Sequence, residues 1–351
     1  MSLLAWYDRN QRELPWRSDW ASLKDPYRVW VSEVMLQQTL IPVVIPAYQK
    51  FVTKFPDLHA LAAAEPADLR EAVKGLGYYR RFGHLHQAAR ILAAQSTPDE
   101  GIKWPKSREE WRKLPGIGEY TSAAIGSIAF DWPLPVIDGN VERVLCRLND
   151  IRKPPNLPEL KPRYRELAAG MMAPWKDRPG DFNQAVMELG QRVCTPSKPD
   201  CNSCPLRAGC LAFQKNSQHL APAPKLRPEF ENVRLALMVP VRRRREGEFE
   251  VALVARGQDH KFLKESRGFW YTDGSFTPPA KSENAGSFNH NITRHKIHAS
   301  VHVIDTKTFP ALMAKENPDW IPAGEVEKEL IASLDLKAWR LVKRHSLAPT
   351  L

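Results

Sequence analysis

Four of the five cysteines in this sequence lie within one short segment, CTPSKPDCNSCPLRAGC. They are spaced C-x6-C-x2-C-x5-C, at Cys194, Cys201, Cys204 and Cys210. Thiolates are soft ligands, and four of them this close together can enclose either a zinc ion or an iron–sulfur cluster. A structural zinc site usually has two C-x2-C pairs and this segment has one, so the spacing favours the cluster. The fifth cysteine, Cys146, stands alone, and no disulfide framework is expected.

Two carboxyl groups stand in settings that suit acid–base chemistry. Glu33 lies among apolar residues in VWVSEVML, and such surroundings raise the pKa of a carboxyl and make it a candidate general acid near neutral pH. The alternative is a glutamate on the solvated face of a helix. Asp138 in PLPVIDGNVERVL lies between an apolar run and the start of a helix. Its simplest role is to cap that helix, and capping is compatible with catalysis.

A glycine-containing turn occurs in LPGIGEYTSAAIGSIAF, residues 114–130. Gly116 and Gly118 permit a tight turn whose backbone N–H groups can come close to a phosphate. The pattern predicts a helix–hairpin–helix, which grips the nucleic-acid backbone without reading sequence. Taken by itself, the same pattern also fits an ordinary corner between two helices.

Residues 1–215 contain mostly helical patterns that would position these groups. DPYRVWVSEVMLQQ begins with Asp25 as a possible N-cap and Pro26 at the first helical position. Apolar residues recur at helical spacing in PADLREAVKGL, LHQAARILAAQ and FNQAVMELGQRVC. We therefore predict a mainly α catalytic domain over residues 1–215.

The pattern changes after the cysteine segment. Residues 216–232 are polar and proline-rich, which predicts a linker of limited flexibility. RLALMVPV and FEVALVAR flank the polar RRRREGE and predict a β-hairpin, and KIHASVHVID alternates like another strand. EVEKELIASLDLKAWRLVKRH is expected to be helical. Residues 233–351 are therefore predicted to form a small α+β domain.

Composition narrows the function classes. The chain has 351 residues with 43% hydrophobic and 26% charged residues, values typical of a soluble protein of two domains. Its net charge of +11 favours a polyanionic partner. No apolar run approaches the roughly 20 residues of a membrane helix, and the amino terminus is charged too early for a secretory signal. We expect no membrane association and a cytoplasmic, nucleoid-associated location.

Together and in this order, these features resemble adenine DNA glycosylases of the MutY type, in the helix–hairpin–helix superfamily that includes endonuclease III. The resemblance covers residues 1–215 through LPWR, DPYRVWVSEVMLQQT, GLGYYRR, LPGIGEYT, VIDGNVERV and FNQAVMELG. Over residues 233–351 it is weaker and rests on the order of elements and on NITRHKI. It implies two helical subdomains, a [4Fe–4S] cluster on the four cysteines and a Nudix-like carboxy-terminal domain.

The resemblance also implies roles for the carboxyl groups and their neighbours. Glu33 would protonate N7 of an adenine flipped out of the duplex, and Asp138 would stabilise the oxocarbenium-like sugar by its charge or by a transient covalent bond. This parallels the two carboxylates of retaining glycosidases. Tyr120 and Asn140 would assist at the sugar and the attacking water. The adenine pocket would be lined by Trp16, Arg17 and Gln184.

DNA contacts are implied at further positions. Gln38 and Tyr78 would wedge into the base stack, which flipping requires because the glycosidic bond is out of reach inside a duplex. In the carboxy-terminal domain a Phe-Ser-His loop of the family contacts 8-oxoguanine, and here Ile292-Thr293-Arg294 stand in its place. Thr293 keeps a hydroxyl, whereas Arg294 replaces the histidine. The DNA-contacting set is Gln37, Gln38, Thr39, Tyr78, Gly116, Gly118, Thr293, Arg294 and His295.

Tyr120 separates two enzyme classes. Bifunctional relatives carry a lysine at this position as the nucleophile for a Schiff base, and a phenol cannot form an imine. We therefore expect a monomeric, monofunctional glycosylase that removes adenine opposite 8-oxoguanine or guanine in double-stranded DNA. The alternatives are an endonuclease III-like glycosylase with lyase activity, which Glu33 and Tyr120 argue against, and a non-catalytic iron–sulfur DNA-binding protein. No Nudix box is present, so pyrophosphate hydrolysis is not expected.

Overall fold

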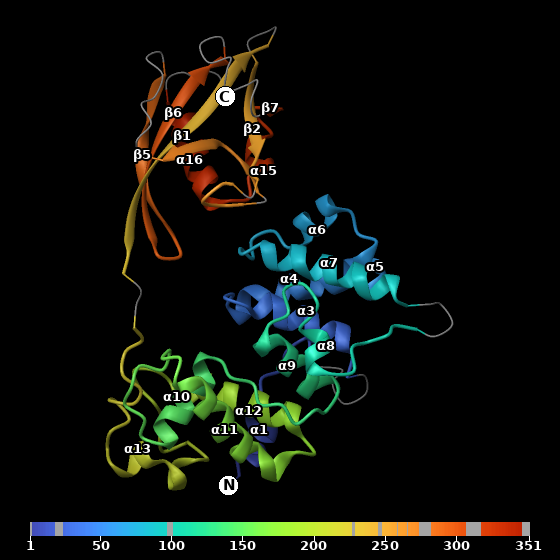
Figure 1. The fold of residues 1–351 in the computed structure, drawn as a ribbon, viewed down its shortest axis with the longest axis vertical. Coiled ribbons are helices and arrows are strands. Elements are labelled where there is room, and N and C mark those ends of the chain that lie inside the picture. The colour runs from blue at the N-terminus through green and yellow to red at the C-terminus, as the bar shows by residue number, and fades with distance from the viewer. Residues whose placement is uncertain are drawn as a thin grey trace. The chain divides into compact units, whose positions relative to one another are not determined.

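The computed structural model describes residues 2–17, 24–96, 101–226, 229–244, 248–257, 259–264, 266–273, 282–306 and 317–345. The chain divides into two compact units, Met1–Leu226 and Arg227–Leu351 (Figure 1). No helix in the described ranges has the length and apolar character that a bilayer-crossing segment requires.

The first unit is helical in its described part, as the sequence predicts. Short 3₁₀ turns occur at Ala173–Trp175 and Arg207–Gly209. Its α-helices are α1 (Leu3–Asn10), α3 (Pro26–Leu36), α4 (Ile41–Lys54), α5 (Leu58–Ala62), α6 (Pro66–Ala72), α7 (Arg80–Ala94), α8 (Arg108–Trp111), α9 (Glu119–Ala129), α10 (Gly139–Leu148), α11 (Leu160–Met172), α12 (Pro179–Arg192) and α13 (Leu211–Gln214).

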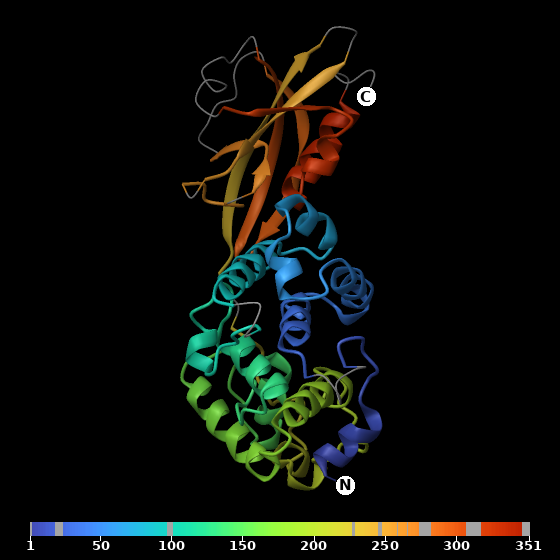
Figure 2. The same ribbon diagram turned by 90° about the vertical axis from the view of Figure 1, so that its right-hand side faces the viewer.

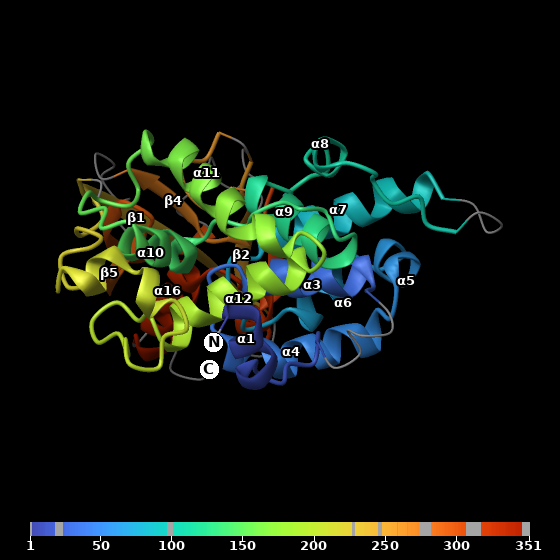
Figure 3. The same ribbon diagram turned by 90° about the horizontal axis from the view of Figure 1, so that it is seen from below.

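Two hydrophobic cores hold these helices together. One lies among α3 to α9 around Trp30 and Trp111, and the other joins α1 with α10, α11 and α12 around Tyr7 and Tyr164. Helix α12 lies beside both α1 and α9 (Figure 3). At Gly180 a Cβ atom would stand 2.8 Å from the carbonyl oxygen of Ser127, so glycine permits this close approach. The two cores correspond to the two predicted helical subdomains.

Helix α3 forms for the reasons that its sequence suggests. The Asp25 side chain accepts a hydrogen bond from the N–H of Tyr27 at 2.9 Å, and Pro26 occupies the first turn. Trp30, Val31 and Met35 are fully buried. Because the helix is enclosed on most sides, Ser32 and Glu33 are buried as well.

The second unit is an α+β domain, as predicted. Its sheet has the strand order β3-β2-β1-β6-β5, with β4 paired to β1 and β7 paired to β2. Strands β1 and β6 run parallel, and the other pairs are antiparallel. Helix α16 packs on β5 and β6 (Figure 2). The elements are β1 (Glu231–Arg243), β2 (Phe249–Ala255), β3 (Arg267–Gly268), β4 (Trp270–Asp273), β5 (Glu283–Ile292), β6 (His295–Asp305), β7 (Asp319–Pro322), α15 (Val326–Glu329) and α16 (Ser333–Arg344).

Two boundaries differ from the sequence prediction. Residues 216–226, predicted as linker, belong to the first unit. The Leu226 N–H donates to Asn156 at 3.0 Å, and the Ala221 carbonyl accepts from the buried Arg147 guanidinium at 2.9 Å. The predicted carboxy-terminal helix is broken into α15 and α16, because the backbone at Leu330 is extended and its side chain enters the hydrophobic core of the second unit.

Candidate active site

Glu33 projects from α3 into the interior, and its side chain is only 7% exposed. The alternative of a solvated glutamate is therefore wrong. Burial raises the pKa of Glu33 to about 7; the Tyr120 hydroxyl and the charge of Arg17 lower it, whereas the charge of Asp138 raises it. Its Oε2 atom has no hydrogen-bond partner among the described residues. Glu33 is therefore a buried carboxyl that can hold or release a proton near neutral pH.

Tyr120 stands at the start of α9 within hydrogen-bonding reach of Glu33. Burial raises the pKa of the Tyr120 phenol well above its ordinary value, and the neighbouring carboxylates raise it further. Its hydroxyl also lies 3.6 Å from the sulfur of Met187 on α12. The phenol is therefore neutral at physiological pH and serves Glu33 as a donor.

Asp138 is the N-cap of α10, as the sequence predicts. One carboxylate oxygen accepts from the N–H groups of Asn140 at 2.9 Å and Val141 at 2.7 Å, and the other accepts from the Asn140 amide at 2.8 Å. Because its charge acts on both Glu33 and Tyr120, Asp138 faces the same space. The cap leaves the carboxylate fixed at the helix N-terminus, whose dipole favours a negative charge there.

The Asn140 side chain is held by Arg143 as well as by Asp138. The Arg143 guanidinium donates to Asn140 Oδ1 at 3.0 Å and to the Gly190 carbonyl at 2.6 Å. At Gly190 a Cβ atom would come within 2.7 Å of the Asn140 Cβ, so only glycine lets α12 approach α10 this closely. Sequence reasoning did not identify Arg143 or Gly190, although both lie in motifs that it singled out.

Arg17 is anchored by Glu188, a fully buried carboxylate on α12 at 2.9 Å. Arg12 and Arg192 also pair with Glu188, at 3.1 and 3.3 Å. Burial by itself raises the pKa of Glu188, but the hydrogen bond and charge of Arg17 together with Arg12 outweigh it and leave the pKa below its ordinary value. Glu188 is a residue that sequence reasoning missed; its signal is a glutamate within the apolar face of FNQAVMELG.

The other predicted pocket residues lie on the same elements. Trp16 precedes Arg17, and its ring meets Tyr48 of α4 edge to face, with centroids 5.4 Å apart. Gln184 is 6% exposed on α12, one helical turn before Glu188. The buried Nε of Arg17 has no hydrogen-bond partner in the described part of the chain. Two buried polar atoms, Arg17 Nε and Glu33 Oε2, are thus left unsatisfied.

The predicted wedge residues occupy two neighbouring loops. Gln37, Gln38 and Thr39 follow α3, and the Thr39 hydroxyl donates to the Leu76 carbonyl at 3.2 Å in the loop that contains Tyr78. Gln38 and Tyr78 both have left-handed backbones, with φ of +57° and +47°, and Tyr78 is 63% exposed. Gln37 donates instead to Thr121 of α9 at 3.3 Å.

The glycine turn links α8 to α9. Gly116 has φ of +75°, and a Cβ atom there would lie 2.6 Å from the Cβ of His84, so both backbone and space require glycine. Gly118 caps α9 without a side-chain hydrogen bond. The turn between helices is as the sequence predicts.

The four clustered cysteines are free thiols that interact electrostatically with one another. Arg147 lies between them: its guanidinium donates to Cys194 Sγ at 3.4 Å, and its carbonyl accepts from Cys210 Sγ at 3.4 Å. Within the described residues, no three His, Cys, Asp or Glu side chains are arranged as a metal site. Four free thiols in one segment, two of them in contact with Arg147, can nevertheless supply the thiolate ligands that a soft metal or an iron–sulfur cluster takes.

In the second unit, the predicted recognition loop is the turn between β5 and β6. Thr293 has φ of +50°, and its hydroxyl donates to the Ile292 carbonyl at 2.8 Å. The Arg294 carbonyl accepts from the N–H of Glu231, whose carboxylate lies 3.1 Å from His295. The Thr293 hydroxyl is thus held within its own turn.

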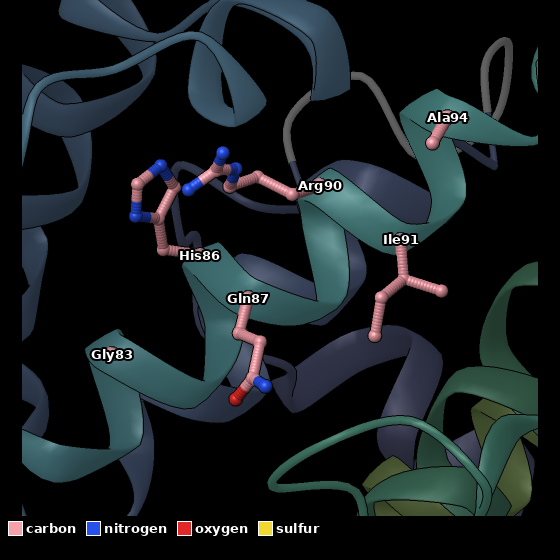
Figure 4. Close-up of a pocket in the computed structure, with 6 residues that line it drawn as sticks. All are labelled: Gly83, His86, Gln87, Arg90, Ile91 and Ala94. Carbon is pink, nitrogen blue, oxygen red and sulfur yellow. The ribbon is translucent and has the colours of Figure 1, made fainter.

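A shallow groove of about 360 Å³ runs along α7, and its residues are Gly83, His86, Gln87, Arg90, Ile91 and Ala94 (Figure 4). In this view the side chains of His86 and Arg90 project from one side of α7 and that of Gln87 from the other. It contains none of the predicted site residues.

Comparisons with known proteins show what the chain is similar to. Residues 31–167 match the HhH-GPD superfamily of base excision DNA repair proteins. The adenine DNA glycosylase of Mus musculus is 42% identical over 239 residues, which cover 67% of this chain and 45% of that protein. That of Homo sapiens is 43% identical over 222 residues, covering 62% of this chain and 40% of the relative.

A solved structure of a thermostable thymine-DNA glycosylase matches with a TM-score of 0.53 and 26% identity, covering 61% of this chain and 94% of that one. The chain spans less than half the length of the two curated relatives described above. The predicted resemblance is confirmed: residues 31–167 match the HhH-GPD superfamily, and the chain is similar to adenine DNA glycosylases.

Proposed function

We propose that this protein is a base excision repair glycosylase that hydrolyses the N-glycosidic bond of adenine in double-stranded DNA. The observation that carries the proposal is the buried Glu33, whose pKa is raised to about 7 and whose Oε2 is unsatisfied. The names of the relatives support adenine as the base.

Glu33 is the general acid. At neutral pH a substantial fraction of this carboxyl is protonated, so it can donate a proton to a ring nitrogen of adenine and convert the base into a better leaving group. Tyr120, neutral and within reach, supports the carboxylate that remains after the proton has left. Because Glu33 and Tyr120 are both buried, the proton passes from Glu33 to adenine without exchange with bulk water.

Asp138 balances the positive charge that develops on the sugar. Its oxygens are fixed by two backbone N–H groups and by Asn140, so little reorganisation is needed when charge appears. Arg143 holds Asn140 in turn, which places its amide to orient the attacking water. The division of labour between Glu33 and Asp138 follows that of retaining glycosidases.

The base pocket is supplied by Arg17, Trp16 and Gln184. The unsatisfied Nε–H of Arg17 and Oε2 of Glu33 are buried groups that need a partner, and a purine edge offers both acceptors and a donor. Glu188 fixes Arg17 and so keeps its donor directed at that space. Trp16 adds an aromatic face for the base.

The opposite base is proposed to be 8-oxoguanine or guanine, with Thr293, Arg294 and His295 contacting it. The enzyme is proposed to be monofunctional, because Tyr120 offers no amine for a Schiff base. It is also proposed to act as a monomer. Cys194, Cys201, Cys204 and Cys210 would hold a [4Fe–4S] cluster. When bound, such a cluster cross-links its segment through iron–thiolate bonds. A cytoplasmic, nucleoid-associated location remains a prediction.

The test is base release from duplexes that contain adenine opposite 8-oxoguanine, guanine, cytosine or thymine, each with and without alkaline treatment. We expect strand breaks only after alkali, and only opposite 8-oxoguanine and guanine. Breaks without alkali would favour the endonuclease III-like alternative. Tight binding with no base release would favour a non-catalytic DNA-binding protein.

A further inference from the structure

Arg81, in the first turn of α7, joins the two loops that carry Gln38 and Tyr78. Its guanidinium is buried, and its Nη1 donates to the carbonyls of Val34 and Met35 at 2.9 and 3.0 Å and to that of Gln37. All three acceptors lie at the carboxy-terminal end of α3 or just beyond it. One half of the guanidinium is thus committed to the first loop.

The other half reaches the second loop. Nη2 donates to the Thr39 hydroxyl at 2.7 Å and to the carbonyls of Leu76 and Gly77 at 3.1 and 3.5 Å. The Phe82 ring lies 4.7 Å from the guanidinium carbon. Arg81 therefore pins residues 37–39 to residues 76–77 through a single planar group.

Arg81 is buried, and the acceptors of these hydrogen bonds are backbone carbonyls and the Thr39 hydroxyl rather than a carboxylate. Burial lowers the pKa of Arg81 to about 10, so the side chain keeps its charge at neutral pH. The carbonyls at the end of α3 provide partial negative charge in return. Removing a charged guanidinium from water costs free energy, which is a high cost for a contact that only joins two surface loops.

Both loops carry a non-glycine residue in the left-handed region. Gln38 and Tyr78 each pay a conformational cost, and such residues persist only when their surroundings fix them. Arg81 donates to the residues directly before each of them, Gln37 and Gly77. Tyr78 is 63% exposed, so the strain maintains an exposed aromatic side chain rather than a buried one.

We propose that Arg81 is a positioning residue that locks the two loops together so that Gln38 and Tyr78 enter the duplex as one rigid wedge. The inference rests on the proposed function. Insertion of the wedge offsets the free energy needed to unstack and unpair the adenine. That free energy is smaller when the adenine is already unpaired. Arg81 thus acts on flipping and leaves the bond-breaking groups untouched.

The experiment compares single-turnover adenine release from two substrates. One is a duplex with adenine opposite guanine, and the other has the same opposite base but a short bubble of unpaired bases centred on the adenine. The variants are Arg81→Met, which removes every donor, and Arg81→Lys, which keeps the charge without the planar fork. Arg90→Met is the matched control, because Arg90 is an exposed arginine on the same helix.

Arg81→Met should slow release from the duplex about tenfold or more, while release from the bubble substrate changes far less, because that adenine is already unpaired. Arg81→Lys should give the same pattern to a smaller extent, and it replaces the Met variant if the latter does not fold. Arg90→Met should leave the ratio of the two rates unchanged. Tyr78→Ala combined with Arg81→Met should show less than additive loss, because both act through the wedge.

Equal losses on both substrates would overturn the inference and assign Arg81 to fold stability alone, and so would an unchanged rate on the duplex. Failure of the wild-type protein to release adenine from either substrate would instead contradict the proposed function. The two failures are therefore distinguishable.

Discussion

Arg17 and Glu188, 171 positions apart in the chain, form an ion pair of 2.9 Å that joins the loop after α1 to the middle of α12. Arg17 also acts on Glu33, whose pKa its charge lowers. Glu188 therefore contributes to the proton affinity of the general acid through an intermediary, without itself reaching the base.

Replacing Glu188 with glutamine should cost on the order of 3 kcal/mol in the free energy of unfolding, because it leaves buried guanidinium charge without its counter-ion. The descending limb of the pH–rate profile should also move to higher pH, since a loosened Arg17 lowers the pKa of Glu33 less. Glu71→Gln is the control, because it removes an exposed carboxylate whose ion pair with Lys74 is worth at most about 1 kcal/mol. Loss of stability with an unmoved limb would show that Glu188 is structural only.

Asp138→Asn separates the two roles of this carboxyl. Asparagine caps helices about as well as aspartate, so the free energy of unfolding should change by less than about 1 kcal/mol. Adenine release should fall at least about 100-fold, because an amide cannot balance positive charge on the sugar. Denaturant titration and single-turnover kinetics measure the two effects. A parallel loss of both quantities would mean that capping is the whole contribution.

The sequence predicts those site residues whose role depends on their neighbours along the chain, and it misses those whose partners are distant in the chain. Asp25 and Pro26 announce the start of α3 locally, and the apolar neighbours of Glu33 announce its burial. Glu188 has only the weaker signal of the apolar residues around it in FNQAVMELG, because a glutamate on an amphipathic helix usually faces solvent and the partner of Glu188 is distant in the chain. Arg81 is hidden for the same reason: its acceptors are backbone carbonyls that no residue type reveals.

Domain boundaries were less predictable. Proline and polar residues describe both a free linker and a packed irregular segment, and the buried Ala221 shows that residues 216–226 are the latter. The segment is packed because the Arg147 guanidinium donates hydrogen bonds to its carbonyls, among them those of Gln218 and Ala221.

A chain that ends after Leu226 should therefore fold and release adenine, whereas one that ends before Ala221 should lose stability, because it lacks the Arg147–Ala221 and Asn156–Leu226 hydrogen bonds. The longer fragment should lose preference for 8-oxoguanine over guanine, because residues 293–295 are absent. The ratio of the release rates on the two mispairs measures this preference, with the 351-residue protein as the control. In the intact protein, Thr293→Ala should weaken the same preference by about 1 kcal/mol. Preference that survives in both proteins would show that the second unit does not read the lesion.

The purified protein should be yellow-brown, with broad absorbance near ~400 nm and about four irons per chain, if the clustered cysteines hold a [4Fe–4S] group. Cys201→Ser should remove much of the colour. Cys146→Ser is the control and should keep it, because Cys146 is buried elsewhere, 3.2 Å from the Tyr164 hydroxyl. A colourless protein with one zinc ion would contradict the cluster.

Glu33→Gln should gain stability as it loses activity. The folded-state pKa of about 7 lies above the ordinary 4.5, so the unfolded chain ionises first, and stability falls as pH rises from about 4.5 through 7. At pH 8 the neutral glutamine avoids this penalty and should stabilise the fold by on the order of 2–3 kcal/mol relative to wild type. Thermal unfolding at pH 5 and pH 8 measures the difference, and a Glu33→Gln variant that is no more stable at pH 8 than wild type would contradict it.

The most direct test of the account is single-turnover adenine release as a function of pH by the wild-type protein and Glu33→Gln, on a duplex with adenine opposite 8-oxoguanine. The wild-type rate should fall as pH rises through about 7, because the proton that Glu33 donates is lost there. Glu33→Gln should bind the duplex and release essentially no adenine at any pH. Turnover by Glu33→Gln near the wild-type rate would contradict the assignment of Glu33 as the acid on which the proposed function rests.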